Sequence, residues 1–175
     1  MRFLPALLAV SSTLLLGACG YHVGPIKPTP MKNVTRVCVP NFKNETLEPR
    51  ISALMANELI KQLQQDGTYQ VTDEGRADVI IQGTITDVER KPARSLRGNI
   101  EQTREYLLNI KGRYRTTYAR SDVVIEERSI TGTTSFFVTG ENLLSADTHQ
   151  DERQAIPLAA QDFAQRVTSL VSEGW

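Results

Sequence analysis

The segment REYLLNIKGRYRTTY, residues Arg104–Tyr118, is the key to the fold, because its side chains alternate with the two-residue period of a β-strand. One face of this strand carries apolar and aromatic side chains: Tyr106, Leu108, Ile110, Tyr114 and Tyr118. The other face carries charged side chains: Glu105, Lys111, Arg113 and Arg115. The pattern predicts a sheet with one face on a hydrophobic core. The polar face either meets water, as in many antiparallel sheets, or docks against a polar partner.

Other strands and two helices are expected around this segment. Further strands rich in β-branched residues are predicted at 34–40, 78–90 and 122–138, and a short strand at 69–72 is left out of the order given below. Helical spacing of apolar residues predicts helices over 48–66 and from about 148 to 172. The order is β-α-β-β-β-α, an α+β two-layer sandwich with both helices on one face of a four-stranded mixed sheet. The first two strands should be parallel, and the last two should form an antiparallel hairpin.

Prolines, glycines and polar residues mark the breaks between these elements. Pro49 suits the first turn of the first helix, and Gly67 suits its C-cap. Pro157 either kinks the second helix or marks its start. Residues 41–46 are expected to form a polar loop, and alternation slips near Glu126–Glu127, which indicates a β-bulge.

The composition is typical of one globular domain. The chain has 175 residues, of which 40% are hydrophobic and 23% charged, and its formal net charge is zero. This balance disfavours binding to nucleic acid, which favours a strongly basic face. Two cysteines provide no disulfide framework. Cys38 lies in an apolar run and is expected to be a buried thiol.

The first residues are expected to form a lipoprotein signal peptide. The apolar run from Leu4 to Leu16 is shorter than the roughly 20 residues of a membrane-spanning helix and fits a secretory signal. The sequence Leu16-Gly17-Ala18-Cys19 resembles a bacterial lipobox, with Cys19 as the acylated residue. We therefore expect a signal peptide at 1–18, a lipidated tether at 19–33 and a single domain at 34–175. The alternative is an ordinary signal peptide with a chance cysteine.

Gly20 follows the expected acylation site, where aspartate would resemble a signal for retention in the inner membrane. The protein is thus expected on the periplasmic side of the outer membrane, held by lipid. Anchoring of this kind needs more than one acyl chain, which a triacylated cysteine provides.

Basic residues concentrate in one part of the chain. Residues 88–120 contain nine basic and three acidic side chains. Four of the cations fall in a segment with proline and serine that we expect to be a loop: Arg90, Lys91, Arg94 and Arg97. Clustered cations beside apolar residues suit an amphiphile that carries phosphates. The alternative is a solvated basic loop.

Signals of catalysis are absent from the sequence. It contains no nucleophile-elbow, zinc-protease or phosphate-loop motif, and its two histidines, His22 and His149, are far apart in the chain. We expect no enzyme activity, no metal site and no cofactor beyond the covalent lipid on Cys19.

Three stretches resemble the LptE family of lipopolysaccharide-assembly lipoproteins. They are Cys19-Gly20-Tyr21-His22-Val23 after the lipobox, the segment from Val37 to Arg50, and the ending Val171-Ser172-Glu173-Gly174-Trp175. The resemblance covers the chain from Cys19 onward. It implies two helices against a four-stranded sheet, and a non-enzymatic protein that plugs the outer-membrane β-barrel LptD, assists its assembly and binds lipopolysaccharide. It also implies that Arg97, just before the third strand, contacts lipid phosphate. The lysine that the better-known branch has before the final helix has no counterpart in residues 144–147.

Other classes of protein share parts of this pattern. A lipoprotein activator of a peptidoglycan synthase, similar to LpoB, also begins its domain with a strand, a polar loop and a helix. Such activators use a long tether to cross the periplasm, whereas the tether expected here has about a dozen residues. A pore-forming lipoprotein similar to the curli-secretion type would need a larger chain.

Overall fold

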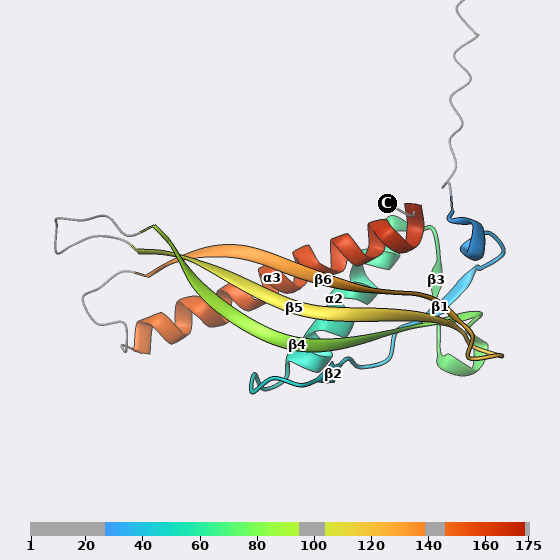
Figure 1. Ribbon diagram of the computed structural model, residues 1–175, viewed down its shortest axis with the longest axis horizontal. Coiled ribbons are helices and arrows are strands. Elements are labelled where there is room, and N and C mark those ends of the chain that lie inside the picture. The colour runs from blue at the N-terminus through green and yellow to red at the C-terminus, as the bar shows by residue number, and fades with distance from the viewer. Residues whose placement is uncertain (1–26, 95–103, 139–145, 174–175) are drawn as a thin grey trace, which may run out of the picture.

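The computed structural model describes residues 27–94, 104–138 and 146–173. Figure 1 shows a long, twisted sheet with two helices packed across one of its faces. The strands are β1 (Arg36–Cys38), β2 (Lys43–Asn44), β3 (Gln70–Val71), β4 (Val79–Arg94), β5 (Arg104–Tyr118) and β6 (Val124–Val138). The helices are α2 (Ile51–Asp66) and α3 (Ala146–Glu173), with short 3-10 turns η2 (Thr29–Met31) and η3 (Glu74–Arg76). The α+β two-layer fold is confirmed.

The sheet has six strands instead of the four that the sequence predicts. Its order is β3-β1-β4-β5-β6, and the two-residue strand β2 also pairs with β4. Strands β1 and β2 both run parallel to β4, whereas β4, β5 and β6 form an antiparallel meander. The expected parallel pair and hairpin are therefore confirmed. The predicted polar loop at 41–46 is wrong at Lys43–Asn44, because these residues find ladder partners on the edge of β4.

Alternation in β5 gives the sheet its two faces. Leu108, Ile110 and Tyr114 are fully buried beneath the helices, as the sequence predicts. The charged residues of the same strand lie on the opposite face, and Arg113 and Arg115 are exposed there. The predicted bulge lies one residue earlier than expected, at Ile125, where Thr116 and Thr117 pair with Glu126 and Val124.

Helix α2 begins later than predicted, at Ile51, because Arg50 adopts a left-handed conformation with φ 62°. Gly67 closes the helix as expected, with φ 73° and its N–H donating to Leu63 O at 3.1 Å. The apolar stripe of α2 enters the same core as that of α3.

Helix α3 begins at Ala146 and continues through Pro157, eleven residues later, so this proline does not mark its beginning. Small residues let it approach the sheet closely. An added Cβ at Gly132 of β6 would lie 2.2 Å from the carbonyl oxygen of Ala159 and 2.6 Å from Phe163 Cβ. Helix and strand backbones therefore touch here, which fixes the position of α3 over the sheet.

Candidate functional site

The basic residues singled out from the sequence lie at the end of β4 and beyond it. Arg90, Lys91 and Arg94 belong to β4, so the strand predicted at 78–90 continues to Arg94 and the prediction of a loop at these positions is wrong. Pro92 does not break the strand, and it pairs with Tyr106 of β5. The described partners on the other edge of β4 are β1 and β2, and their pairing with β4 reaches no further than Ile85. A proline is tolerated on such an edge because its missing N–H removes no ladder bond. Arg97 lies outside the described residues.

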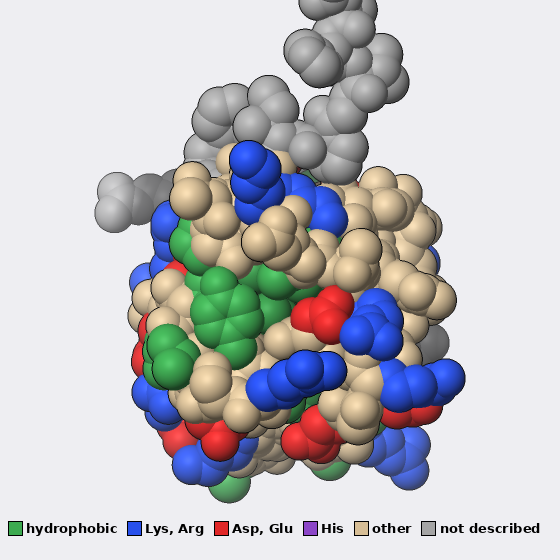
Figure 2. Space-filling view, turned by 90° about the vertical axis from the view of Figure 1, so that its right-hand side faces the viewer, with side chains coloured by type: hydrophobic (Ala, Val, Ile, Leu, Met, Phe, Trp, Pro, Cys, Tyr) green, Lys and Arg blue, Asp and Glu red, His purple; other side chains and the backbone are tan. Residues whose placement is uncertain are grey.

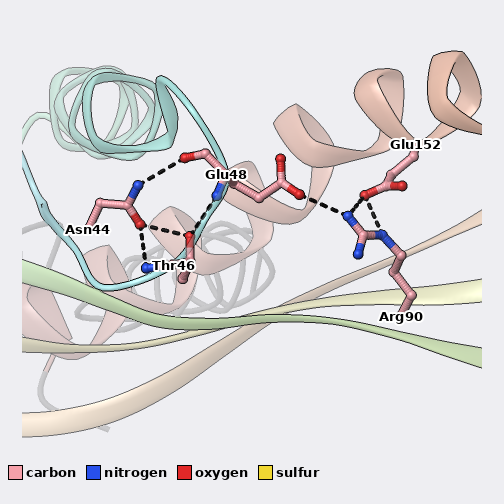
Figure 3. A network of polar contacts seen from close by, with 5 residues as sticks. All are labelled: Asn44, Thr46, Glu48, Arg90 and Glu152. Carbon is pink, nitrogen blue, oxygen red and sulfur yellow. Dashed lines mark hydrogen bonds and ion pairs between the residues drawn. The ribbon is translucent and has the colours of Figure 1, made fainter.

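Arg90 is held by two carboxylates, as Figure 3 shows. Its guanidinium donates to the carboxylate of Glu152 on α3 and, at 2.8 Å, to that of Glu48 in the loop before α2. The hydrogen bond to Glu152, which is almost fully buried, raises the pKa of Arg90 above its ordinary value, and Glu48 adds to this shift. Arg90 therefore joins the strand, the loop and the helix, and its charge is largely compensated within the molecule.

The side chain of Lys91 is more exposed than that of the neighbouring Arg90. Its ammonium lies 3.1 Å from Glu89, which also pairs with Lys111 at 2.8 Å. These two lysines, Lys111 first, hold the pKa of Glu89 below its usual range. The backbone of Arg94 pairs with Glu105 at the far end of the ladder. Lys91 and Arg94 thus remain candidates for contact with an anionic ligand, whereas Arg90 has a structural role.

The open face of the sheet is polar and cross-linked by charges. It contains a shallow depression of about 210 Å³ lined by Lys43, Gln82, Thr84, Arg113, Arg115 and Glu127. Arg115 pairs with Glu127 at 2.7 Å, and Glu45 lies 2.9 Å from Lys43 and 3.6 Å from Arg113. Cations and anions alternate across the face, so it suits a polar surface better than an apolar one.

The expected tether meets the domain earlier than Val34. Met31 is buried in the core, and the Tyr118 hydroxyl donates to Pro30 O at 2.7 Å. Lys27 donates to Val34 O at 2.6 Å and lies 4.7 Å from the centre of the Tyr69 ring, a cation–π contact. Residues 27–31 thus contact the domain and form the turn η2 there, whereas Lys32 and Asn33 are exposed. The boundary of the tether at residue 33 stays a prediction.

Figure 2 views the end of the molecule at which this packed segment lies. Apolar side chains gather there in a patch bordered by lysines, arginines and acidic residues. The turn between β5 and β6 also lies at this end and exposes Val123 and Val124 (Figure 1). The basic end of β4 lies at the opposite end of the sheet (Figure 1).

The remaining predictions from the sequence concern a thiol, metals and membrane spans. Cys38 is a buried free thiol, as predicted, and burial raises its pKa. Among the described residues, no three or more histidine, cysteine or acidic side chains converge as a metal site would require. No helix in the same part of the chain is both long and apolar enough to cross a membrane.

A family model described as "LptE: Lipopolysaccharide-assembly" matches residues 34–170. The chain belongs to the LptE family. The match confirms the resemblance found in the sequence, and it assigns the chain to a lipopolysaccharide-assembly family. The match covers the whole sheet and nearly all of α3, so the open face and the basic end of β4 both belong to the LptE-like region.

Solved structures that match this LptE-family chain share little sequence with it, and those with a TM-score above 0.5 share its fold. A hypothetical protein from Chlamydia trachomatis has a TM-score of 0.53 at 11% identity, over 79% of this chain and 96% of its own. A protein from Xanthomonas campestris has a TM-score of 0.51 at 13% identity, over 79% and 82%. A minor lipoprotein from Acinetobacter baumannii has a TM-score of 0.48 at 16% identity, over 79% and 91%. No curated protein sequence matches the chain.

Proposed function

We propose that this LptE-family chain is an outer-membrane lipoprotein that plugs an LptD-type β-barrel, assists its assembly and takes part in lipopolysaccharide insertion. In this proposal residues 1–18 are removed as a signal peptide and Cys19 carries the acyl chains. The observation that carries the plug is the open sheet face, whose charged side chains pair with one another while two helices cover the other face.

The open face matches the chemistry of a barrel lumen. Large outer-membrane barrels have polar, water-lined interiors, which accept ion-paired and hydrogen-bonding side chains without an uncompensated loss of hydration. The length of the molecule also fits. Strands of 15 and 16 residues extend about 50 Å, compared with about 25 Å for the apolar band of such a barrel. A body of this length spans the band and reaches both rims.

The packed N-terminal segment gives the proposed plug a direction. Only the residues between Cys19 and Lys27 link the acyl chains to the packed segment, a reach of at most about 28 Å. The end shown in Figure 2 would therefore lie near the leaflet that holds the acyl chains. The end of β4 that carries Lys91 would lie toward the opposite leaflet, where lipid phosphates would bind this lysine. Arg94 and Arg97 stay candidates for the same contact.

Affinity purification tests the plug directly. Tagged full-length protein is purified from detergent-solubilised outer membranes, and its partners are identified and quantified by mass spectrometry. We expect a large β-barrel at near-equal stoichiometry. Recovery of a cell-wall synthase instead would replace the plug with the activator alternative.

The lipid anchor has its own test. Cys19→Ala should move the protein from the membrane fraction to the soluble fraction, with unchanged circular dichroism of the purified domain. Retention of this variant in the membrane fraction of cells that lack the barrel would contradict acylation at Cys19.

Contact with lipopolysaccharide is tested with charge reversals. Lys91→Glu and Arg97→Asp should weaken binding of purified lipopolysaccharide, and Arg76→Glu at the other end of the molecule is the matched control. Equal binding by all three variants would remove the lipid contact from the proposal and leave the plug.

A further inference from the structure

One leucine is fully exposed on a loop whose other residues are held by hydrogen bonds. Leu47, in the connection between β2 and α2, has a relative exposure of 102%, against 54% for Leu158 on α3. Single exposed apolar residues are common on protein surfaces and need no explanation by themselves. The hydrogen bonds on either side of Leu47 set it apart.

The loop around Leu47 is closed by its own side chains, as Figure 3 shows. Asn44 donates from Nδ2 to Glu48 O at 2.9 Å, and its Oδ1 accepts from Thr46 N at 2.9 Å and Thr46 Oγ1 at 2.7 Å. Thr46 Oγ1 in turn accepts from Glu48 N at 3.2 Å. These bonds fix the backbone immediately before and after Leu47.

Contacts with the rest of the molecule hold the loop from outside. Glu45 N donates to Ile85 O on β4 at 2.9 Å, and the Glu48 carboxylate is bound by Arg90. Arg50 keeps its left-handed backbone at the end of the loop, a conformation that persists in a non-glycine residue only when its surroundings impose it. The position of Leu47 is therefore set before any partner arrives.

We propose that Leu47 is a preorganised anchor that inserts into an apolar pocket in the protein wall facing the open sheet face. This inference rests on the proposed plug and names one of its contacts. The pocket it requires is apolar with a polar rim, because Lys43 and Glu45 lie beside the leucine in the chain. A rigid loop loses little conformational freedom on binding, so burial of the leucine contributes to affinity with little ordering penalty.

The location of the loop supports a protein wall as the occupant. Strand β2 lies on the edge of β4, and Glu45 reaches back to Arg113 on the open face at 3.6 Å. Leu47 follows Glu45 by two residues, so a surface that covers the open face also meets the loop. Leu47 makes this contact at the border of a polar interface, where a single apolar side chain fixes the register of docking.

The test compares Leu47→Ala with Leu158→Ala, a matched loss of an exposed leucine on α3. Each full-length variant is co-produced with the barrel, and the complex is titrated in detergent. We expect unchanged thermal unfolding for both variants. Leu47→Ala should weaken the barrel complex about 30-fold, the value for burial of one leucine side chain, and Leu158→Ala should leave it unchanged.

A second pair of variants tests the preorganisation. Thr46→Val removes the hydroxyl that bonds Asn44 and Glu48 while it keeps the side-chain shape. It should weaken the complex when Leu47 is present and have a smaller effect in the Leu47→Ala background, because a mobile loop matters only if it carries the anchor. Equal effects in both backgrounds would overturn the preorganised anchor.

The remaining outcomes separate this inference from the proposed function. Equal capture of the barrel by the wild type and Leu47→Ala would overturn the anchor and leave the plug intact. Absence of the barrel from the wild-type sample would overturn both. A Leu47→Ala effect on binding to lipid vesicles alone, or on self-association alone, would assign the leucine to a lipid or to a second copy and overturn the protein pocket.

Discussion

Gly132→Ala should weaken the attachment of α3 to the sheet. Gly132 lies on β6 under the middle of α3, and an added Cβ would be 2.2 Å from Ala159 O, 2.6 Å from Phe163 Cβ and 2.8 Å from Phe163 N. Ordinary contacts of a Cβ lie between 3.4 and 4 Å. The helix must therefore move away from the strand by more than about 1 Å, since a 6–12 potential does not tolerate such overlap.

The size of the effect follows from which atoms clash. Two are backbone atoms and the third is a Cβ, so none can rotate away as the end of a flexible side chain could. Overpacking of a core costs about 1–3 kcal/mol, and we expect a value near 3 kcal/mol here because the displaced helix also loosens Phe163. For a domain of this size each kcal/mol lowers Tm by about 2–4 °C, so the expected fall is about 6–12 °C.

Thermal unfolding followed by circular dichroism measures this fall. The matched control is Gly75→Ala, because a Cβ added at Gly75 would have no atom within 4 Å and the residue has no positive φ. The control should change stability by less than about 0.5 kcal/mol. If the two variants melt within about 2 °C of each other, the close approach of α3 and β6 would be refuted.

Three further predictions concern ionic and backbone features. Arg90→Ala should lower the free energy of urea unfolding by about 1–3 kcal/mol, because Glu152, its buried partner on α3, loses its counter-charge. The control Lys91→Ala, at an exposed lysine, should change this free energy by less than about 0.5 kcal/mol. Equal effects of the two variants would contradict the structural role of Arg90. The hydrogen bond from Arg36 holds the pKa of Asp78 well below its usual range, so Asp78 stabilises the fold above about pH 4 and loses this contribution at lower pH. The difference in the free energy of unfolding between wild type and Asp78→Asn, measured by denaturant titration, should therefore decrease from pH 5 to pH 2. A constant difference over this range would contradict the stabilising role of the Asp78 carboxylate. Arg50→Gly should raise the free energy of urea unfolding by up to about 1 kcal/mol by relieving the left-handed backbone, and a fall in that free energy would show that the backbone at Arg50 is not strained.

The elements with a long apolar period were predictable from the sequence. The alternation of β5 and the stripe of α2 each identify which side chains enter the core, and both are confirmed. The short strand β2 was predicted as a loop because two residues carry no period, and only its pairing with β4 makes it a strand. The short strand at 69–72 is confirmed as β3, although the predicted four-stranded sheet leaves it out. A loop was predicted at the end of β4 because the segment contains proline and serine. The prediction is wrong because Pro92 is accommodated within the ladder beside Tyr106, which the sequence does not reveal.

The candidate site divides in the same way. The sequence identified a cluster of cations but could not assign their partners, because Glu48 and Glu152 lie 42 and 62 residues away from Arg90 in the chain. One signal was available: the spacing Asn44, Thr46 and Glu48 is typical of a side-chain-closed turn. The burial of Met31 and the contacts of Lys27 and Pro30 carried no such signal, since the prolines of this segment are equally typical of an extended tether.

Periodicity and residues close together in the chain were enough to predict the local order of strands and helices and the two-faced character of β5. The resemblance of three stretches to the LptE family indicated the family, which the match over residues 34–170 confirms. Contacts between distant segments were needed for the rest: that Arg90 is bound within the molecule, that Leu47 is presented on a fixed loop and that Met31 is buried in the core. Such contacts form only when the helices pack on the sheet, so they contribute to stability only in the folded protein. No local pattern of residues therefore predicts them.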